Sequence, residues 1–413
     1  MSFDWPLKRI SEVANFENNK RIPLKSLDRE KRQGIYPYYG ASGVVDHIDD
    51  FIFDGRYLLI SEDGENLRTR NTPIAFQASG KFWVNNHAHI LSEKEEGILD
   101  YLEYYFSVLN IGAYITGAVQ PKLNKANLDK IEIPIPPKDE RLKLNNILNS
   151  LKYKVALNSE TNQTLEQMAQ AIFKSWFVDF DPVKAKMNGE QPEGMDTATA
   201  SLFPEKLVES ELGLIPDGWD ACLIENVTSK VFSGGTPATK NDEFWGGDLP
   251  WLSSGETRNN FIIETEKYIT EAGVKGSSTK ASAYGDILIA SAGQGHTRGQ
   301  TSFNSIDCYI NQSIVALRAA TNVSAYWLYY CLERRYDEMR SVSDSHSSRG
   351  SLTTKLLKGM PAIMPSKDIV NAFDSLVEPL VRKQIANSNQ NTELSALRDT
   401  LLPKLLSGEL TLD

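Results

Sequence analysis

The 413-residue sequence predicts an α+β fold built by tandem duplication. We expect two mixed α/β domains separated by two long helices, packed as an antiparallel coiled coil with pseudo-two-fold symmetry. Three observations predict this fold. Distant segments repeat each other in one register, two long stretches keep an apolar residue every seven positions, and the remainder is rich in β-branched and aromatic runs between Gly, Asn and Asp.

The duplication is visible as matching segments at a nearly constant spacing. Chance agreement of several positions in one register, two asparagines among them, is improbable. The spacing is 229 residues, or 226 for the last pair, and relates 135–139 to 364–368, 58–60 to 287–289, Asn158 to Asn387, Asn162 to Asn391, and 84–86 to 310–312.

Each mixed domain is expected to combine strands with one short amphipathic helix. The first domain covers residues 1–137 and the second covers residues 214–366. The predicted elements are strands at 51–60, 82–91 and 287–290, and helices at 101–109 and 325–335.

Two long helical segments follow the mixed domains. The central one covers residues 138–186, with a clear seven-residue apolar row from Lys138 to Trp176. The distal one covers residues 367–413 and contains Pro379, which we expect to kink or locally break the helix. Residues 187–213 are rich in Gly, Pro, Thr and Ala and are predicted to be a linker.

Both helices carry two asparagines near the middle of the apolar row. These are Asn158 and Asn162 in the first helix and Asn387 and Asn391 in the second. A polar residue on such a seam fixes the register, because its amide needs a partner. Parallel and antiparallel packing would both bring the layers together, and chain connectivity favours the antiparallel arrangement. The alternative is solvated asparagines on irregular helices.

The composition indicates a globular protein in the cytoplasm. The chain has 54 acidic and 44 basic residues, a net charge of -10, which argues against coating nucleic acid with positive charge. The acidic excess is uneven, since residues 138–220 hold nine basic and 14 acidic residues and residues 221–360 hold 14 of each. No apolar run reaches the ~18 residues of a membrane helix, and three cysteines form no C-x-x-C pair.

The usual signatures of catalysis are missing from the sequence. Residues 273–280 have the wrong spacing for a phosphate-binding loop, and no nucleophile elbow occurs. The Asn/Asp-Pro-Pro-aromatic loop of amino-methyltransferases is matched only in part, by residues 181–183. We therefore predict no catalytic centre and no metal site in this chain.

Four segments resemble conserved parts of one family, the specificity subunits of Type I restriction-modification systems. Residues 171–183 (AIFKSWFVDFDPV) resemble its central conserved region, and residues 397–410 (LRDTLLPKLLSGEL) resemble its distal one. Residues 117–124 (GAVQPKLN) are similar to the end of the first recognition domain, and residues 214–219 (LIPDGW) to the start of the second. With the duplicated layout, the resemblance covers the whole chain.

The resemblance implies a non-catalytic DNA reader. Each target recognition domain would bind one half of a bipartite site, and the helix pair would set the spacer and dock two methyltransferase subunits. Restriction-translocase subunits would then join the complex. S-adenosylmethionine, ATP and Mg²⁺ are expected on these partner subunits, with no cofactor on this chain.

Residues expected to face double-stranded DNA are polar or basic groups in loops beside glycines. Arg suits guanine or phosphate, Gln suits adenine, and a single Lys more often contacts phosphate. For each, the alternative is a solvated loop residue, and His87 with His89 is expected to have a structural or DNA-facing role. The candidates are Lys20, Arg21, Tyr38, Tyr39, Arg68, Arg70, Gln120, Lys122, Thr236, Lys240, Gln294, His296, Arg298, Ser348 and Arg349.

Trp176, Phe177 and Phe180 form an aromatic group at the end of the first helix. They are candidates for docking a methyltransferase subunit, and the alternative is that they close a local core. Two other functions remain open. One is a duplicated carbohydrate- or protein-binding module without DNA activity, and the other is an enzyme with an unrecognised active site.

Overall fold

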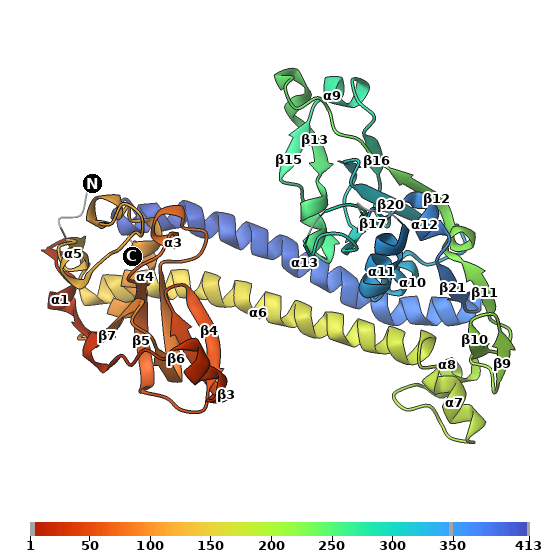
Figure 1. Cartoon of the computed structure of the whole chain (residues 1–413), viewed down its shortest axis with the longest axis horizontal. Coiled ribbons are helices and arrows are strands. Elements are labelled where there is room, and N and C mark those ends of the chain that lie inside the picture. Colours follow the sequence, from red (N-terminus) through yellow and green to blue (C-terminus); the bar gives the residue numbers. More distant parts are fainter. Residues whose placement is uncertain (1–4, 294, 347–349, 411–413) are drawn as a thin grey trace. The chain divides into compact units, whose positions relative to one another are not determined.

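The computed structural model describes residues 5–293, 295–346 and 350–410. Three of the predicted DNA-facing residues, Gln294, Ser348 and Arg349, therefore lie outside the described residues. The chain forms two compact units (Figure 1). Unit 1 contains residues 1–155 and 393–413, and unit 2 contains residues 156–392.

Unit 1 is built around a six-stranded sheet in the order β2-β7-β5-β6-β3-β4. Adjacent strands of this sheet are antiparallel, except that β3 and β6 run parallel, with Tyr38 opposite Trp83. The sheet strands are β2 (Ala14–Phe16), β3 (Gln33–Gly40), β4 (Gly43–Ile48), β5 (Phe53–Ser61), β6 (Ala75–Val84) and β7 (Ala88–Glu93). The other elements are β1 (Leu7–Lys8), α1 (Ile10–Val13), η1 (Asn18–Lys20), α2 (Ser26–Glu30), α3 (Asn66–Thr69), α4 (Ile98–Val108), η2 (Gly112–Tyr114), α5 (Lys125–Leu128) and β8 (Ile133–Pro134).

Unit 2 contains a five-stranded sheet in the order β12-β20-β17-β18-β14 and a four-stranded sheet in the order β15-β13-β19-β16. Its first strands are β9 (Leu207–Ser210), β10 (Gly213–Pro216), β11 (Asp220–Leu223), β12 (Thr228–Ser233), β13 (Trp245–Leu252), β14 (Phe261–Ile262) and β15 (Lys267–Ile269). The later strands are β16 (Lys280–Ser282), β17 (Ile287–Ala290), β18 (Thr301–Asn304), β19 (Cys308–Ile310), β20 (Ile314–Ala319) and β21 (Pro361–Met364). The helices are α7 (Asp181–Met187), α8 (Thr197–Ser201), η3 (Ile224–Val227), η4 (Asp242–Phe244), η5 (Ser254–Arg258), α9 (Glu271–Lys275), α10 (Ala325–Glu333), α11 (Tyr336–His346) and α12 (Thr354–Lys358).

The strand pairings of the two units agree with the predicted duplication. The order β2-β7-β5-β6 of unit 1 corresponds to β12-β20-β17-β18 of unit 2. The parallel pair β3 and β6 corresponds to β13 and β19, which are also parallel. The single long strand β6 is represented in unit 2 by two short strands, β18 and β19, so one sheet becomes two. The strand predicted over 82–91 is likewise two strands, since a turn separates β6 from β7.

The two long helices are α6 (Lys138–Phe177) and α13 (Lys367–Leu406), 40 residues each. Within unit 2, Asn158 Nδ2 donates to Asn391 Oδ1 at 2.9 Å, and Asn387 Nδ2 donates to Asn162 Oδ1 at 2.8 Å. Residue numbers therefore increase along α6 in the direction in which they decrease along the facing α13. The predicted antiparallel packing is confirmed, and the amides pair across the seam.

The expected break at Pro379 is wrong, because α13 continues across it without interruption. A proline removes one hydrogen bond, here the bond to the carbonyl of Ser375. Both residues are exposed, so water can bond to that carbonyl. Val377 and Val381 on the opposite face are fully buried, and their packing holds the helix together.

The segment predicted to be a linker, residues 187–213, is more ordered than expected. It contains α8, whose N-terminal Asp196 accepts a hydrogen bond from Thr199 N, and strand β9, which pairs with β10. Phe203 is 2% exposed and belongs to the core of unit 2, and Lys186 Nζ donates to its carbonyl oxygen at 2.5 Å. This segment has too few apolar side chains to show a periodic pattern, but Phe203 still anchors it in the core of unit 2.

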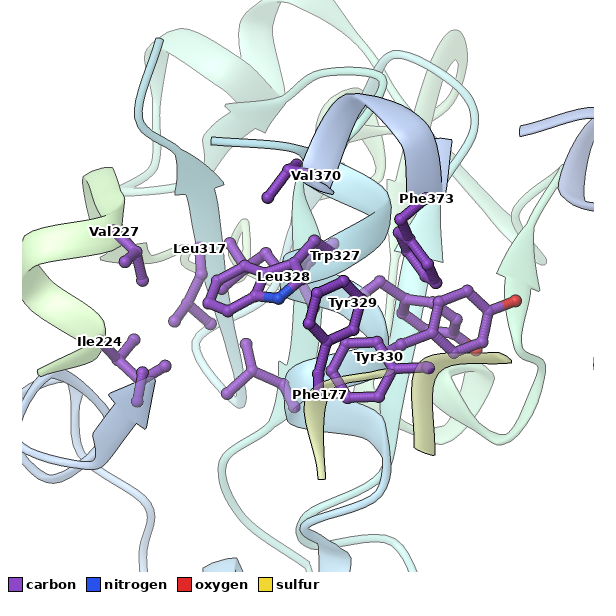
Figure 2. Close-up of a cluster of buried hydrophobic side chains, with 14 of the residues drawn as sticks. Phe177, Ile224, Val227, Leu317, Trp327, Leu328, Tyr329, Tyr330, Val370 and Phe373 are labelled. Atoms are coloured by element: carbon purple, nitrogen blue, oxygen red, sulfur yellow. The ribbon is translucent and has the colours of Figure 1, made fainter. Parts of the chain in front are cut away.

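The core of unit 2 gathers side chains from its sheet, α10 and both long helices. Figure 2 shows Trp327, Tyr329 and Tyr330 from α10 close to Phe177 of α6 and Phe373 of α13. The rings of Phe177 and Phe373 are 5.1 Å apart and nearly perpendicular. Among the described residues, no helix combines the length and apolar character that crossing a membrane requires.

Candidate nucleic-acid interface

Loops from distant parts of unit 1 are joined by three backbone hydrogen bonds. Glu62 N, after β5, donates to His87 O at 2.8 Å, and Asn85 N donates to Tyr39 O, at the end of β3, at 3.1 Å. Leu123 N, which follows the loop 116–122, donates to Glu62 O at 2.8 Å. The loops after β3, β5 and β6 and the loop 116–122 thus meet in one region.

Unit 2 repeats the same three bonds at the corresponding positions. Ser291 N donates to Ser313 O at 2.8 Å, Asn311 N to Leu252 O at 3.1 Å, and Leu352 N to Ser291 O at 2.8 Å. Most of these residues lie 229 or 226 positions after their counterparts in unit 1, which are the offsets seen in the sequence. Leu252 lies 213 positions after its counterpart, Tyr39. Each unit therefore presents one equivalent cluster of loops, which we call the loop face.

A charged network stabilises the loop face of unit 1. Glu62 forms ion pairs with Arg21 at 2.6 Å and with Lys122 at 3.4 Å. Burial disfavours the Glu62 carboxylate, but the hydrogen bond from Arg21 and the charges of His89, Arg21 and Lys122 outweigh it, so its pKa is lowered. Burial lowers the pKa of His89, and its Nε2 is 2.7 Å from Leu123 O.

The predicted residues of unit 1 fall into two groups. Arg68, Gln120 and Lys122 lie together, because Arg68 Nη2 donates to Gly117 O at 2.8 Å and Lys122 closes the same loop. Arg21 joins them through Glu62, and Lys20 is exposed and paired with Glu17 at 2.8 Å.

Tyr38, Tyr39 and Arg70 have internal contacts instead. Tyr38 is fully buried and its hydroxyl accepts a hydrogen bond from Leu24 N at 3.0 Å, so the expected DNA-facing position is not seen. Tyr39 packs with its ring 5.5 Å from that of Phe82. The Arg70 guanidinium donates to the carbonyl oxygens of Phe106, Ser107 and Leu109 at the end of α4.

In unit 2, the predicted residues show the same division. Thr236 Oγ1 donates to Gln312 Oε1, and Lys240 and His296 are exposed. Arg298 is only 8% exposed, donates to Gly350 O and pairs with Asp344. Its expected role in contacting DNA is therefore replaced by a structural one, because burial needs partners for the guanidinium charge.

Two exposed amides on the loop faces were missing from the predicted site. Asn86 lies in the turn between β6 and β7, and Gln312 lies in the corresponding turn between β19 and β20. Both side chains are exposed. The sequence carried a signal for them, because 84–86 and 310–312 repeat each other. Amide side chains at such positions can read adenine edges.

The aromatic group at the end of α6 is part of the core. Trp176, Phe177 and Phe180 are 6%, 7% and 8% exposed, and the Phe180 ring meets Trp219 at 5.7 Å. The core interpretation therefore describes these residues, and the expected docking surface is not exposed. Phe180 lies at the N-terminus of α7 and has a left-handed backbone with φ of 56°.

The two histidines do not form a metal site. His87 is near Asp63, with Nδ1 2.9 Å from Oδ1, whereas His89 is buried with Asn18 Nδ2 2.8 Å from its Nδ1. Within residues 5–293, 295–346 and 350–410, no group of three or more His, Cys, Asp or Glu side chains could hold a metal ion.

The family model described as "Type I restriction modification DNA specificity domain" matches residues 3–167 and 216–388. The two matches cover most of the chain, once for each repeat. The chain belongs to this family of Type I restriction-modification specificity subunits. Membership favours DNA recognition over a carbohydrate- or protein-binding module.

Relatives from two organisms match nearly the whole chain. It is 27% identical to the HindI specificity subunit of Haemophilus influenzae over 86% of this chain and 84% of that protein. It is 23% identical to the MjaIX specificity subunit of Methanocaldococcus jannaschii over 99% and 94%. The Type I restriction-modification S subunit from M. genitalium has a similar fold, with a TM-score of 0.67 and 15% identity over 97% and 96% of the two chains.

Proposed function

We propose that this chain recognises a bipartite double-stranded DNA target, one half with each mixed domain. The observation that carries the proposal is the repetition of the loop face, with three equivalent backbone hydrogen bonds in each unit. Loops on a rigid scaffold are where binding residues concentrate. Two equivalent loop faces in one chain suit a target that has two separate half-sites.

The loop face of unit 1 has suitable chemistry for this task. Lys122 and Arg68 have half-exposed side chains, 50% and 42%, that can reach phosphates while keeping their internal partners. Gln120 and Asn86 are exposed amides that can bond to base edges. Phosphate contacts position a protein on DNA, and contacts with base edges supply the specificity.

In this proposal the chain has no catalytic role of its own. Two methyltransferase subunits bind to it and carry S-adenosylmethionine, the paired helices α6 and α13 set the spacer between the half-sites, and restriction-translocase subunits bring ATP and Mg²⁺. The protein acts in the cytoplasm. The acidic segment 138–220, with nine basic and 14 acidic residues, is better suited to these protein partners than to DNA.

Methylome sequencing of a host that carries the gene tests this function. We expect a methylated motif with two specific parts and a non-specific gap. Replacing residues 1–137 by those of a relative should change one part of the motif and leave the other part unchanged. Methylation of DNA by the isolated chain with S-adenosylmethionine would refute the non-catalytic role.

A further inference from the structure

The loop 116–122 of unit 1 is a closed hairpin with a fixed base. Thr116 N donates to Lys122 O at 2.9 Å, and Lys122 N donates back to Thr116 O at 2.7 Å. Gly64 N, from the loop after β5, donates to Pro121 O at 3.1 Å. The hairpin is thereby joined to a neighbouring loop of the same loop face.

The tip of this hairpin is also held in place. Arg68 Nη2 donates to the carbonyl oxygens of Gly117 at 2.8 Å and Ala118 at 3.4 Å. Gly117 has a φ of 87°, and a Cβ atom there would lie 2.1 Å from Gln120 O, so only glycine fits this turn. The tip is therefore ordered before any ligand arrives.

Val119 stands at the end of this ordered tip with its side chain 96% exposed. A single exposed apolar residue is common on protein surfaces and needs no explanation by itself. Val119 differs because it lies on a fixed tip, next to Gln120 and three residues from Lys122, within the loop face. A rigid tip loses little conformational entropy on binding, so its contacts contribute fully to affinity.

Resting on the proposed function, we propose that Val119 contacts the C5-methyl group of a thymine in the major groove of the half-site bound by unit 1. An apolar side chain recognises thymine there through this methyl group, which no other base of DNA presents. Gln120 then faces the neighbouring base edge, and Lys122 is close enough to the strand to contact a phosphate.

Unit 2 fixes Gly350, two residues before Leu352, in a similar way. The Arg298 guanidinium donates to Gly350 O, as Arg68 does to Gly117 O, and Leu352 N donates to Ser291 O at 2.8 Å. An arginine that donates to a glycine carbonyl shortly before this backbone bond is therefore a feature of both repeats. This recurrence supports a role for the arginine in the duplicated interface.

The test compares thymine with deoxyuridine, which lacks the methyl group, in duplexes of the methylated motif. The full chain with its methyltransferase subunits is used at one fixed salt concentration, and deoxyuridine replaces every thymine of one half-site at a time. The variant is Val119→Ser, which leaves no methyl group on the side chain, whereas threonine would keep one that can still contact thymine. Ile35→Ser is the control, since Ile35 is also exposed, at 80%, but lies near the opposite end of β3 from the loop face.

For the wild type and Ile35→Ser, deoxyuridine in one half-site should weaken binding about fourfold, the factor expected for one buried methyl group. Val119→Ser should lose this sensitivity and respond normally in the other half-site. Full sensitivity of Val119→Ser, insensitivity of the wild type in both halves, or a unit 1 half-site without A·T pairs would overturn the inference. A methylome without a bipartite motif would instead refute the proposed function.

Discussion

Replacing Glu333 by Gln should change the pH dependence of stability in unit 2. Glu333, at the end of α10, faces Glu166 of α6, and Gln170 Nε2 lies between them, 3.4 Å from Glu333 Oε1 and 3.0 Å from Glu166 Oε1. Burial, and then the charge of Glu166, raise the pKa of Glu333 to about 7, while Arg334 opposes the rise. Burial also raises the pKa of Glu166, against its hydrogen bonds from Tyr330, Gln384 and Gln170.

The sign of the effect follows from proton linkage. The folded chain binds the Glu333 proton more tightly than the unfolded chain, whose pKa is the ordinary 4.5. Raising the pH from about 4.5 to about 7 therefore destabilises the wild type through this group. A tenfold change in an acid constant corresponds to ~1.4 kcal/mol, so the rise from 4.5 to about 7 gives at most ~3 kcal/mol.

Urea unfolding of the full chain between pH 4.5 and 8 measures this effect. The stability of Glu333→Gln relative to the wild type should rise from pH 4.5 to about 7 and stay constant above that. Glu160→Gln, which removes an exposed carboxylate from α6, is the matched control for the loss of one negative charge and should not reproduce this rise. A constant difference for Glu333→Gln, or one that falls with pH, would refute the reasoning.

Three further predictions follow from the packing and the charge. Asn162→Ala removes the partner of the buried Asn387 amide and should lower the urea-unfolding free energy by about 1–3 kcal/mol, whereas Leu at both positions should come close to the wild type; equal losses in both would contradict this. The double variant Phe177→Ser and Phe180→Ser should lose about 3–5 kcal/mol of folding free energy for each ring, which is enough to unfold unit 2. Unfolding would be seen as a loss of the near-ultraviolet circular dichroism signal. A folded variant that no longer binds the methyltransferase would favour the docking role. The isolated chain, with a net charge of -10, should bind DNA weakly and with a steep salt dependence in equilibrium titrations; nanomolar specific binding at physiological salt would contradict this.

Sequence patterns predicted the helices well because their spacing reports a local geometry. The seven-residue row from Lys138 to Trp176 became α6, which ends one residue later at Phe177. The central helical segment predicted over 138–186 is not continuous, because a separate short helix, α7, follows from Asp181 to Met187. The asparagine positions predicted the paired layers, because a buried amide needs a partner on the facing helix. Pro379 misled the prediction, since the cost of one missing hydrogen bond is small beside the packing of a 40-residue helix.

The candidate DNA-facing residues were harder to predict because exposure depends on distant parts of the chain. Tyr38 and Arg298 stand beside glycines in loop-like sequence, yet one is buried under Trp83 and Ile48, and the other holds Gly350 in place. Arg68 and Lys122 have similar local sequence and remain half-exposed. No pattern within a few residues separates these two outcomes.

The sequence by itself determined the duplication, the two long helices and the family, because repeats, heptads and conserved segments are properties of residue order. Only the tertiary structure decided which polar groups meet. Glu62, His87 and Leu123 are far apart in sequence and adjacent in the fold, and their counterparts in unit 2 form the same bonds. The loop face depends on these long-range backbone contacts, which residue order specifies only through the folded chain.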